Sequence, residues 1–130
     1  MKILLKRGYD KAARGDGVRV LIDRLWPRGV KKADVHVKLW TKQIAPSTDL
    51  RRWFGHDPKR WPEFCKRYRR ELKAPRTRAV IQQTLRAAKK ARSITLVYGA
   101  RDRERNEAVV LRGVFKRFVR RIDKAKEVQQ

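Results

Sequence analysis

The chain has 130 residues, and its 37 Lys and Arg against 13 Asp and Glu give a formal net charge of +24 at pH 7. Hydrophobic residues make up 41% of the chain, which is enough to build a core and excludes a wholly disordered basic tail. The lack of an apolar run of about 18 residues argues against a membrane span, and the short charged beginning argues against a signal peptide. The single cysteine, Cys65, excludes an internal disulfide. We therefore expect one reduced, cytoplasmic domain.

The first third of the sequence predicts two strands separated by a turn. Residues 2–7 form a short apolar run, and residues 18–25 are rich in β-branched side chains. Gly15-Asp16-Gly17 between them has the composition of a turn. Trp26-Pro27-Arg28-Gly29 ends the second strand, because proline has no N–H to donate to a sheet and glycine permits a turn. Beyond it the pattern over residues 31–44 is ambiguous, with partial helical spacing only.

The middle of the chain predicts three helices in succession. Ser47 has the character of an N-cap for a short helix over residues 48–54. The next helix presents one apolar face, with residues spaced three and four apart: Trp61, Phe64, Cys65, Tyr68 and Leu72. Pro75 breaks that helix, and a further helix is predicted over residues 77–92.

The last third predicts a buried strand and a final helix. Residues 93–99 are a nearly continuous apolar run, which is typical of a strand covered on both faces. A charged loop over 100–105 leads to a helix that ends near Asp123, with 124–130 as a frayed polar tail. This order of elements predicts a small single-domain α/β fold over residues 1–123, with three or four mostly parallel strands packed with about five helices.

Two motifs in the sequence are distinctive: Arg24-Leu25-Trp26-Pro27-Arg28-Gly29 and Gly55-His56-Asp57-Pro58. With them, the chain resembles the YeaO-like branch of the bacterial domain-of-unknown-function family 488, over residues 1 to about 118. The resemblance implies a compact cytoplasmic α/β protein and supplies no reaction. Related branches carry Cys-His-Arg after the last strand, whereas Gly99-Ala100-Arg101-Asp102 stands here, so a thiol mechanism does not transfer to this chain.

The charge predicts a polyanionic partner. Residues 59–92 hold thirteen Lys and Arg, opposed only by Glu63 and Glu71. We therefore expect nucleic-acid binding through phosphate contacts with little sequence specificity, because no helix-turn-helix, zinc finger or RNA-binding signature accompanies the charge. A charged surface kept for solubility, or a compositional bias toward arginine, is the alternative. The expected contacts are Lys59, Arg60, Lys66, Arg67, Arg70, Arg76, Arg78, Arg101 and Arg105.

A second site is predicted where the carboxyl ends of parallel strands meet. The candidate catalytic residues there are Asp23, as a base or a water orienter, with His56 and Asn106 as helpers. The candidate anion- or substrate-binding residues are Arg24, Trp26, Arg28, Arg51 and Tyr98.

Each of these roles has a structural alternative. The Asp23 carboxylate could simply pair with Arg24 or Arg28, His56 could be a turn residue, and Asn106 could cap the last helix. The site therefore suggests either a small enzyme acting on a nucleotide, a nucleobase in DNA or RNA, or another anionic substrate, or else a non-catalytic interaction module. We expect neither a cofactor nor a metal, since the two histidines lie twenty residues apart without a third ligand at motif spacing.

Overall fold

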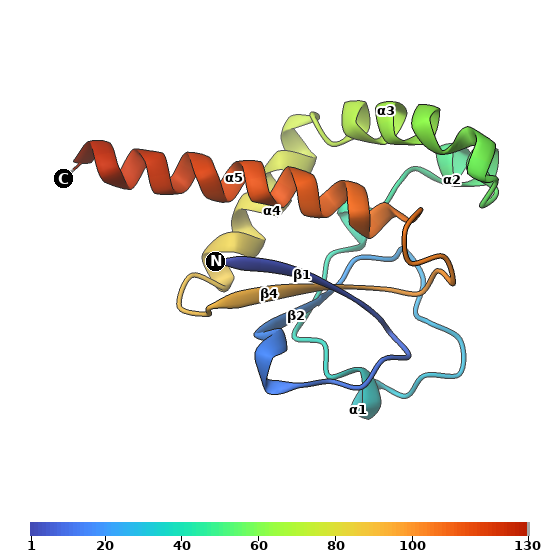
Figure 1. Ribbon diagram of the computed structural model, residues 1–130, viewed down its shortest axis with the longest axis horizontal. Coiled ribbons are helices and arrows are strands. Elements are labelled where there is room, and N and C mark those ends of the chain that lie inside the picture. The colour runs from blue at the N-terminus through green and yellow to red at the C-terminus, as the bar shows by residue number, and fades with distance from the viewer. Residues whose placement is uncertain (130) are drawn as a thin grey trace.

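A four-stranded sheet with the strand order β1-β4-β2-β3 forms the centre of the structure, a computed structural model that describes residues 1–129 (Figure 1). All three pairs of neighbouring strands are parallel. The strands are β1 (Lys2–Arg7), β2 (Val18–Leu21), β3 (Leu39–Trp40) and β4 (Ser93–Tyr98). All six residues of β4 are buried, as its apolar run predicts. The small parallel α/β fold expected from the sequence is confirmed.

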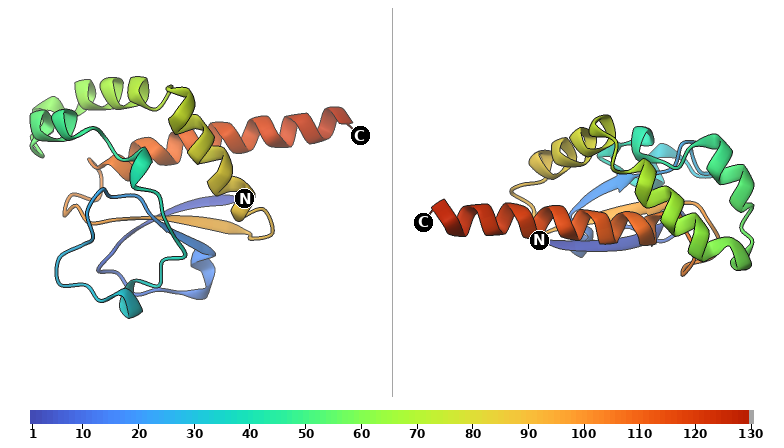
Figure 2. Two further views of the ribbon diagram at one scale, coloured as in Figure 1. Left: turned by 180° about the vertical axis from the view of Figure 1, so that it is seen from behind. Right: turned by 90° about the horizontal axis from the view of Figure 1, so that it is seen from above.

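Five α-helices are present in the described part of the chain: α1 (Lys32–Val35), α2 (Thr48–Phe54), α3 (Trp61–Glu71), α4 (Pro75–Ala87) and α5 (Glu107–Gln129). The four longer helices lie on one side of the sheet, and α1 lies on the other (Figures 1 and 2). Helix α5 packs over β1 and β4. None of these helices combines the length and the apolar character that a membrane crossing requires.

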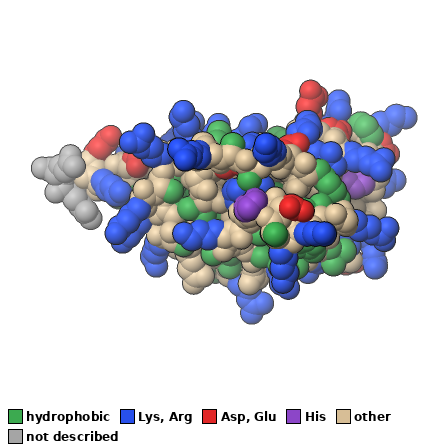
Figure 3. Space-filling model, turned by 90° about the horizontal axis from the view of Figure 1, so that it is seen from below, with side chains coloured by type: hydrophobic (Ala, Val, Ile, Leu, Met, Phe, Trp, Pro, Cys, Tyr) green, Lys and Arg blue, Asp and Glu red, His purple; other side chains and the backbone are tan. Residues whose placement is uncertain are grey.

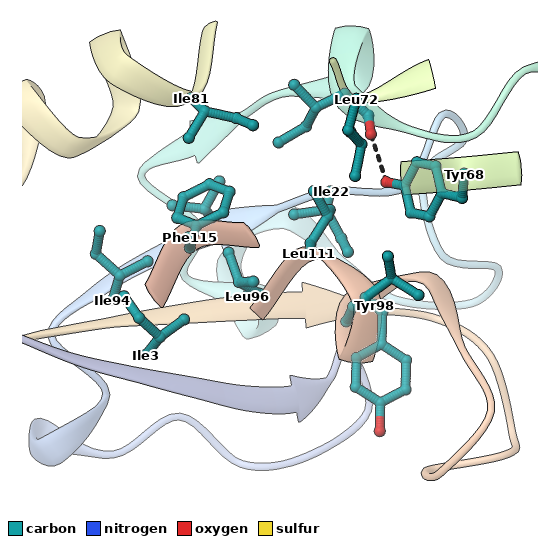
Figure 4. Packing of buried hydrophobic residues seen from close by; sticks show 14 of the residues in the cluster. Ile3, Ile22, Tyr68, Leu72, Ile81, Ile94, Leu96, Tyr98, Leu111 and Phe115 are labelled. Atoms are coloured by element: carbon teal, nitrogen blue, oxygen red, sulfur yellow. Dashed lines mark hydrogen bonds between the residues drawn. The ribbon is translucent and has the colours of Figure 1, made fainter. Parts of the chain in front are cut away.

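The main core lies between the sheet and helices α2 to α5 (Figure 4). The apolar face of α3 contributes Phe64, Cys65, Tyr68 and Leu72, as its spacing predicts. The buried Tyr68 hydroxyl donates to the backbone oxygen of Ile44 at 2.5 Å, which ties α3 to the segment before α2. A smaller apolar cluster covers the opposite face of the sheet under α1. The sheet is therefore covered on both faces, as parallel sheets generally are.

Five boundaries differ from those that the sequence predicts, and two of them are the ends of α4, at Ala87 and not at residue 92, and of β4, at Tyr98 and not at residue 99. Strand β2 ends at Leu21 and not at residue 25. At Asp23 the backbone oxygen accepts from the indole N–H of Trp40, and the carboxyl group accepts from the N–H of Gly99, in place of backbone hydrogen bonds between strands. Pro75 is the first residue of α4, which is a position that proline favours. The predicted helix end near Asp123 is wrong. Helix α5 continues to Gln129, because the residues after Asp123 include neither proline nor glycine.

Candidate functional site

A cavity of about 250 Å³ opens at the carboxyl ends of β2 and β4, and we call it the strand-end pocket. The segment after β2, helix α2 and the start of α5 all contribute to its lining. Its polar lining residues are Asp23, Arg24, Arg51, His56, Arg105, Asn106 and Glu107. Its apolar walls come from Leu25, Ala45, Pro46, Phe54 and Phe64. The structure thus places a mixed polar and apolar cavity at the sheet edge where the sequence predicts a site.

Asp23 is the most strongly perturbed titratable group of this pocket. Its Oδ2 accepts a hydrogen bond from the backbone N–H of Gly99 at 2.8 Å, while its Oδ1 is buried without a protein partner. Burial, and then the neighbouring carboxyl group of Glu107, raise the pKa of Asp23 to about 9, against the smaller opposing effects of Gly99 and Arg51. Asp23 therefore holds a proton at neutral pH and can donate a hydrogen bond into the pocket.

The protonated state of Asp23 changes the role that this residue can take. A neutral carboxyl group is a hydrogen-bond donor or a general acid, whereas a general base must be ionised. No ion pair joins Asp23 to Arg24 or Arg28 among the residues that the structure describes. Arg24 instead donates through Nη2 to the backbone oxygen of Pro46 at 3.3 Å.

His56 and Asn106 line the pocket, and each also has a structural task. The backbone of His56 is left-handed, with φ of 58°, directly after Gly55 at the end of α2. The side chain of Asn106 is buried, and its Oδ1 accepts from the N–H of Val109 at 3.2 Å. Its Nδ2 donates to the backbone oxygen of Asp102 at 2.9 Å. Asn106 thus caps α5, and both groups of its amide are engaged.

Trp26, Arg28 and Tyr98 do not line the strand-end pocket. Trp26 donates through Nε1 to the backbone oxygen of Val30 at 2.6 Å, and it packs edge-on against Trp40. Arg28 lies on the exposed turn beyond Pro27. Tyr98 is buried in the main core at the end of β4 (Figure 4). In the motif Arg24 to Gly29, Arg24 and Leu25 therefore line the strand-end pocket, whereas Trp26 and Arg28 do not.

Glu107 is the pocket residue that the sequence does not single out. The proximity of its carboxyl group raises the pKa of Asp23. In the sequence an acid in the first turn of α5 indicates only a favourable interaction with the helix dipole. Its position directly after the cap of the helix that follows β4 is the signal that would place it at the carboxyl edge of the sheet.

The expected nucleic-acid contacts lie on the surface. They come from the turn before α3, from α3 and α4, and from the loop before α5; all are exposed except Arg78, which is half-buried. Arg60 and Arg67 both lie over the ring of Trp53, at 5.2 and 4.3 Å from its centroid. Figure 3 shows how Lys and Arg side chains outnumber acidic ones on one face of the molecule.

Comparisons with known proteins give the chain its relatives. The family profile DUF488-N3i, described as the inactive DUF488-N3 subclade, matches residues 2–130. The uncharacterized protein YeaO of Escherichia coli K12 is 40% identical over 111 residues, which cover 85% of this chain and 94% of YeaO. Uncharacterized proteins of Mycobacterium bovis and Mycobacterium tuberculosis H37Rv are each 45% identical over 71 residues, 55% of this chain and 60% of theirs. No solved structure matches the chain with statistical significance.

Proposed function

Because this chain belongs to the DUF488-N3i family, the inactive DUF488-N3 subclade, we propose that it acts without catalysis, as a cytoplasmic protein that binds nucleic acid. The binding rests mainly on contacts to phosphate groups and has little sequence specificity. The observation that carries this proposal is the distribution of charge over helices α4 and α5.

Two long stretches of the chain contain basic residues and no acidic ones. Residues 72–101 hold eight Lys and Arg, and residues 108–122 hold five, without one Asp or Glu in either. The first stretch includes α4 and the second lies within α5, and these two helices contact each other. Unscreened repulsion among so many like charges raises the free energy of the folded protein, and a bound polyanion removes that repulsion.

Two carboxylates of the neighbouring helix α3 are engaged elsewhere. Glu63 pairs with Arg67 at 3.2 Å on the surface of α3. Glu71 accepts from the backbone N–H and the hydroxyl group of Ser47, at 2.8 and 2.6 Å. The acid-free stretches therefore keep their positive charge, which favours attraction to phosphate groups at a distance.

The tryptophans favour phosphate contacts over base stacking as the main source of affinity. Trp26 is half-buried and its indole N–H is bonded to the backbone of Val30. Trp53 is half-buried and lies beneath two guanidinium groups. Both side chains are thus held in contacts within the protein, which makes them less available for base stacking.

Titration of labelled oligonucleotides at several salt concentrations tests the proposal. We expect the logarithm of the dissociation constant to rise linearly with the logarithm of salt concentration, because binding releases counterions from the nucleic acid. Oligonucleotides of equal length and unrelated sequence should bind with affinities within about threefold of one another. Binding that is absent at low salt, or that does not respond to salt, would contradict the proposal.

A second candidate function is the binding of a small anionic ligand in the strand-end pocket. The protonated Asp23 lies there among the exposed guanidinium groups of Arg24, Arg51 and Arg105. Such a set suits a phosphate or carboxylate group on a ligand that fills the apolar part of the cavity.

Thermal-shift measurements with nucleoside monophosphates test this candidate. A ligand that raises the melting temperature of the wild type should lose this effect in Arg51→Gln. Arg28→Gln is the matched control, because it removes the same charge outside the pocket. Equal responses of the two variants would place the ligand elsewhere.

A further inference from the structure

A second cavity lies between α3, α4 and α5, with a volume of about 180 Å³, and we call it the helical groove. Among its lining residues five are basic and none is acidic: Arg69, Lys73, Arg78, Arg117 and Arg121. It shares no lining residue with the strand-end pocket, so the two cavities are separate features of the molecule.

The floor of the helical groove is apolar and well packed. Leu72 and Phe118 are 3% and 7% exposed and belong to the main core, and Val114 packs against that core. Because tightly packed core residues change position little, the floor gives the groove a stable shape. The residual exposure of Phe118 leaves no free aromatic face on which a base could stack.

The basic side chains are held over this floor without carboxylate partners. The guanidinium groups of Arg78 and Arg121 lie 5.4 and 5.8 Å from the ring centroid of Phe118. These contacts position the two guanidinium groups beside the ring through cation–π attraction. None of the five basic groups forms an ion pair within residues 1–129.

We propose that the helical groove is the binding site for one backbone phosphate group of a bound nucleic acid. This inference rests on the nucleic-acid binding proposed above and names the place on the surface where the strand is held. Five donors of positive charge around one small cavity suit an anion with several acceptor oxygens, and four of them are arginines that can bind phosphate in bidentate fashion.

The side chains of the groove also lack acceptors for the amino groups of nucleobases. Its lining holds no Asn, Gln, Ser, Thr, Asp or Glu. The exocyclic amino groups of adenine and cytosine need an acceptor, and the groove supplies none from its side chains. A binding site that recognises phosphate alone accounts for binding with little sequence specificity.

The groove lies where a bound strand would meet further positive charge. Lys73 and Arg78 belong to the acid-free stretch 72–101, and Arg117 and Arg121 belong to the acid-free stretch 108–122. One phosphate fixed in the groove therefore places its neighbours along the strand over the other basic residues of α4 and α5, which make weaker and more diffuse contacts.

Two triple variants with the same change of charge test the inference. The groove variant carries Lys73→Gln, Arg117→Gln and Arg121→Gln, and all three of these side chains are exposed. The control variant carries Arg14→Gln, Arg28→Gln and Lys31→Gln, which are exposed and line neither cavity. Both variants lower the net charge by three and remove one lysine and two arginines.

We expect the groove variant to bind a labelled single-stranded 20-mer about tenfold or more weakly than the wild type at equal salt. The slope of affinity against salt should fall by about 1, since the lost contact to one phosphate lowers it by about 1. The control variant should lose less than about threefold. Amide NMR spectra of the wild type should shift at groove residues when the oligonucleotide is added.

The outcomes separate this inference from the function on which it rests. Equal losses of affinity in both triple variants would contradict a phosphate-binding site in the groove and would leave diffuse nucleic-acid binding intact. Failure of the wild type to bind at low salt would remove the proposed function itself. Equally strong competition by polyglutamate, a polyanion without phosphate, would overturn phosphate recognition. The single variant Arg121→Glu, compared with Arg14→Glu, gives the same test if a triple variant does not fold.

Discussion

The backbone N–H of Gly99 donates to Oδ2 of Asp23 at 2.8 Å and so joins the end of β4 to the segment after β2. The side chain of Asp23 approaches so closely that a Cβ atom at Gly99 would lie 2.9 Å from the same oxygen. The lack of a side chain at position 99 therefore allows the carboxyl group to occupy the wall of the strand-end pocket. That placement removes the group from water, which is the largest cause of its raised pKa.

The pKa of Asp23 predicts a dependence of stability on pH. Its value of about 9 in the folded protein lies above the ordinary value of 3.8, so the folded protein retains a proton that the unfolded chain releases. The wild type should therefore lose stability as pH rises from about 4 toward about 9. We expect the free energy of unfolding to fall by about 4 to 5 kcal/mol between pH 5 and pH 8.5 on this account. Urea denaturation at both pH values measures it.

The variant Asp23→Asn isolates this effect. Its amide oxygen can accept from the N–H of Gly99, and its amide N–H can donate toward Glu107, so it mimics the protonated acid. We expect it to match the wild type near pH 5 and to exceed it in stability at pH 8.5. An unchanged pH dependence in this variant would show that Asp23 does not carry the proton.

Gly17 lies at a left-handed backbone position in contact with β4. Its φ is +64°, and a Cβ atom there would lie 2.0 Å from the backbone oxygen of Ser93. We expect Gly17→Ala to destabilise the protein by about 3 kcal/mol or more, through backbone strain and displacement of β4. Gly15→Ala is the control, because a Cβ atom at Gly15 meets nothing within 4 Å. Thermal unfolding of both variants should show a large loss for Gly17→Ala only.

Ser47 caps α2 and also anchors the end of α3. Its hydroxyl group accepts from the N–H of Leu50 at 3.2 Å and donates to Glu71 at 2.6 Å. We expect Ser47→Ala to lower the free energy of unfolding by about 1 to 2 kcal/mol, because it removes the cap and one partner of the carboxylate. Chemical denaturation against Thr48→Ala, at the next position, provides the comparison. Similar losses in both variants would argue against a capping role.

Asp10 and Arg103 form a two-pronged ion pair near the surface, with N···O distances of 2.9 and 2.8 Å. The hydrogen bond from Arg103 is the main reason that the pKa of Asp10 falls to about 2. A lowered pKa stabilises the folded protein above about pH 4, and this contribution is lost as pH falls toward 2. Because Arg103 is largely exposed and its ion pair is screened by solvent, we expect Arg103→Gln to change stability little at pH 7. NMR titration of Asp10 should show its pKa returning toward the ordinary value in that variant.

The strands with the strongest patterns were predictable from the sequence. β1 coincides with the predicted strand, and the apolar run at β4 revealed both its position and its burial on two faces. Strand β3 was not predicted, because two residues are too few for a period to be recognised. The end of α5 was misplaced because helix propensity continues through residues 124–129 and no stop signal follows Asp123.

The candidate site was predictable in its location and less so in its members. Parallel strands bring their carboxyl ends to one edge, which correctly placed Asp23 with residues of the β4–α5 loop. Trp26 and Arg28 are close to Asp23 in the sequence, yet the turn at Pro27 directs them elsewhere. Periodicity carries no information on the direction of such a turn. The partnership of Asp23 with Glu107 depends on side-chain packing between segments more than eighty residues apart, which a single sequence does not reveal.

The strand order has a consequence for how the chain reaches its structure during synthesis. Strands β1 and β2 pair with β4 and not with each other, and β4 does not exist until residue 98 has been made. Strand β1 therefore waits for most of the chain before it can pair, and until then β2 can pair only with the two-residue strand β3. Such long-range pairing slows folding and leaves unpaired edges open to association with other chains. The synthesis of β4 therefore completes the sheet, and α5, which packs over β1 and β4, is made only afterwards.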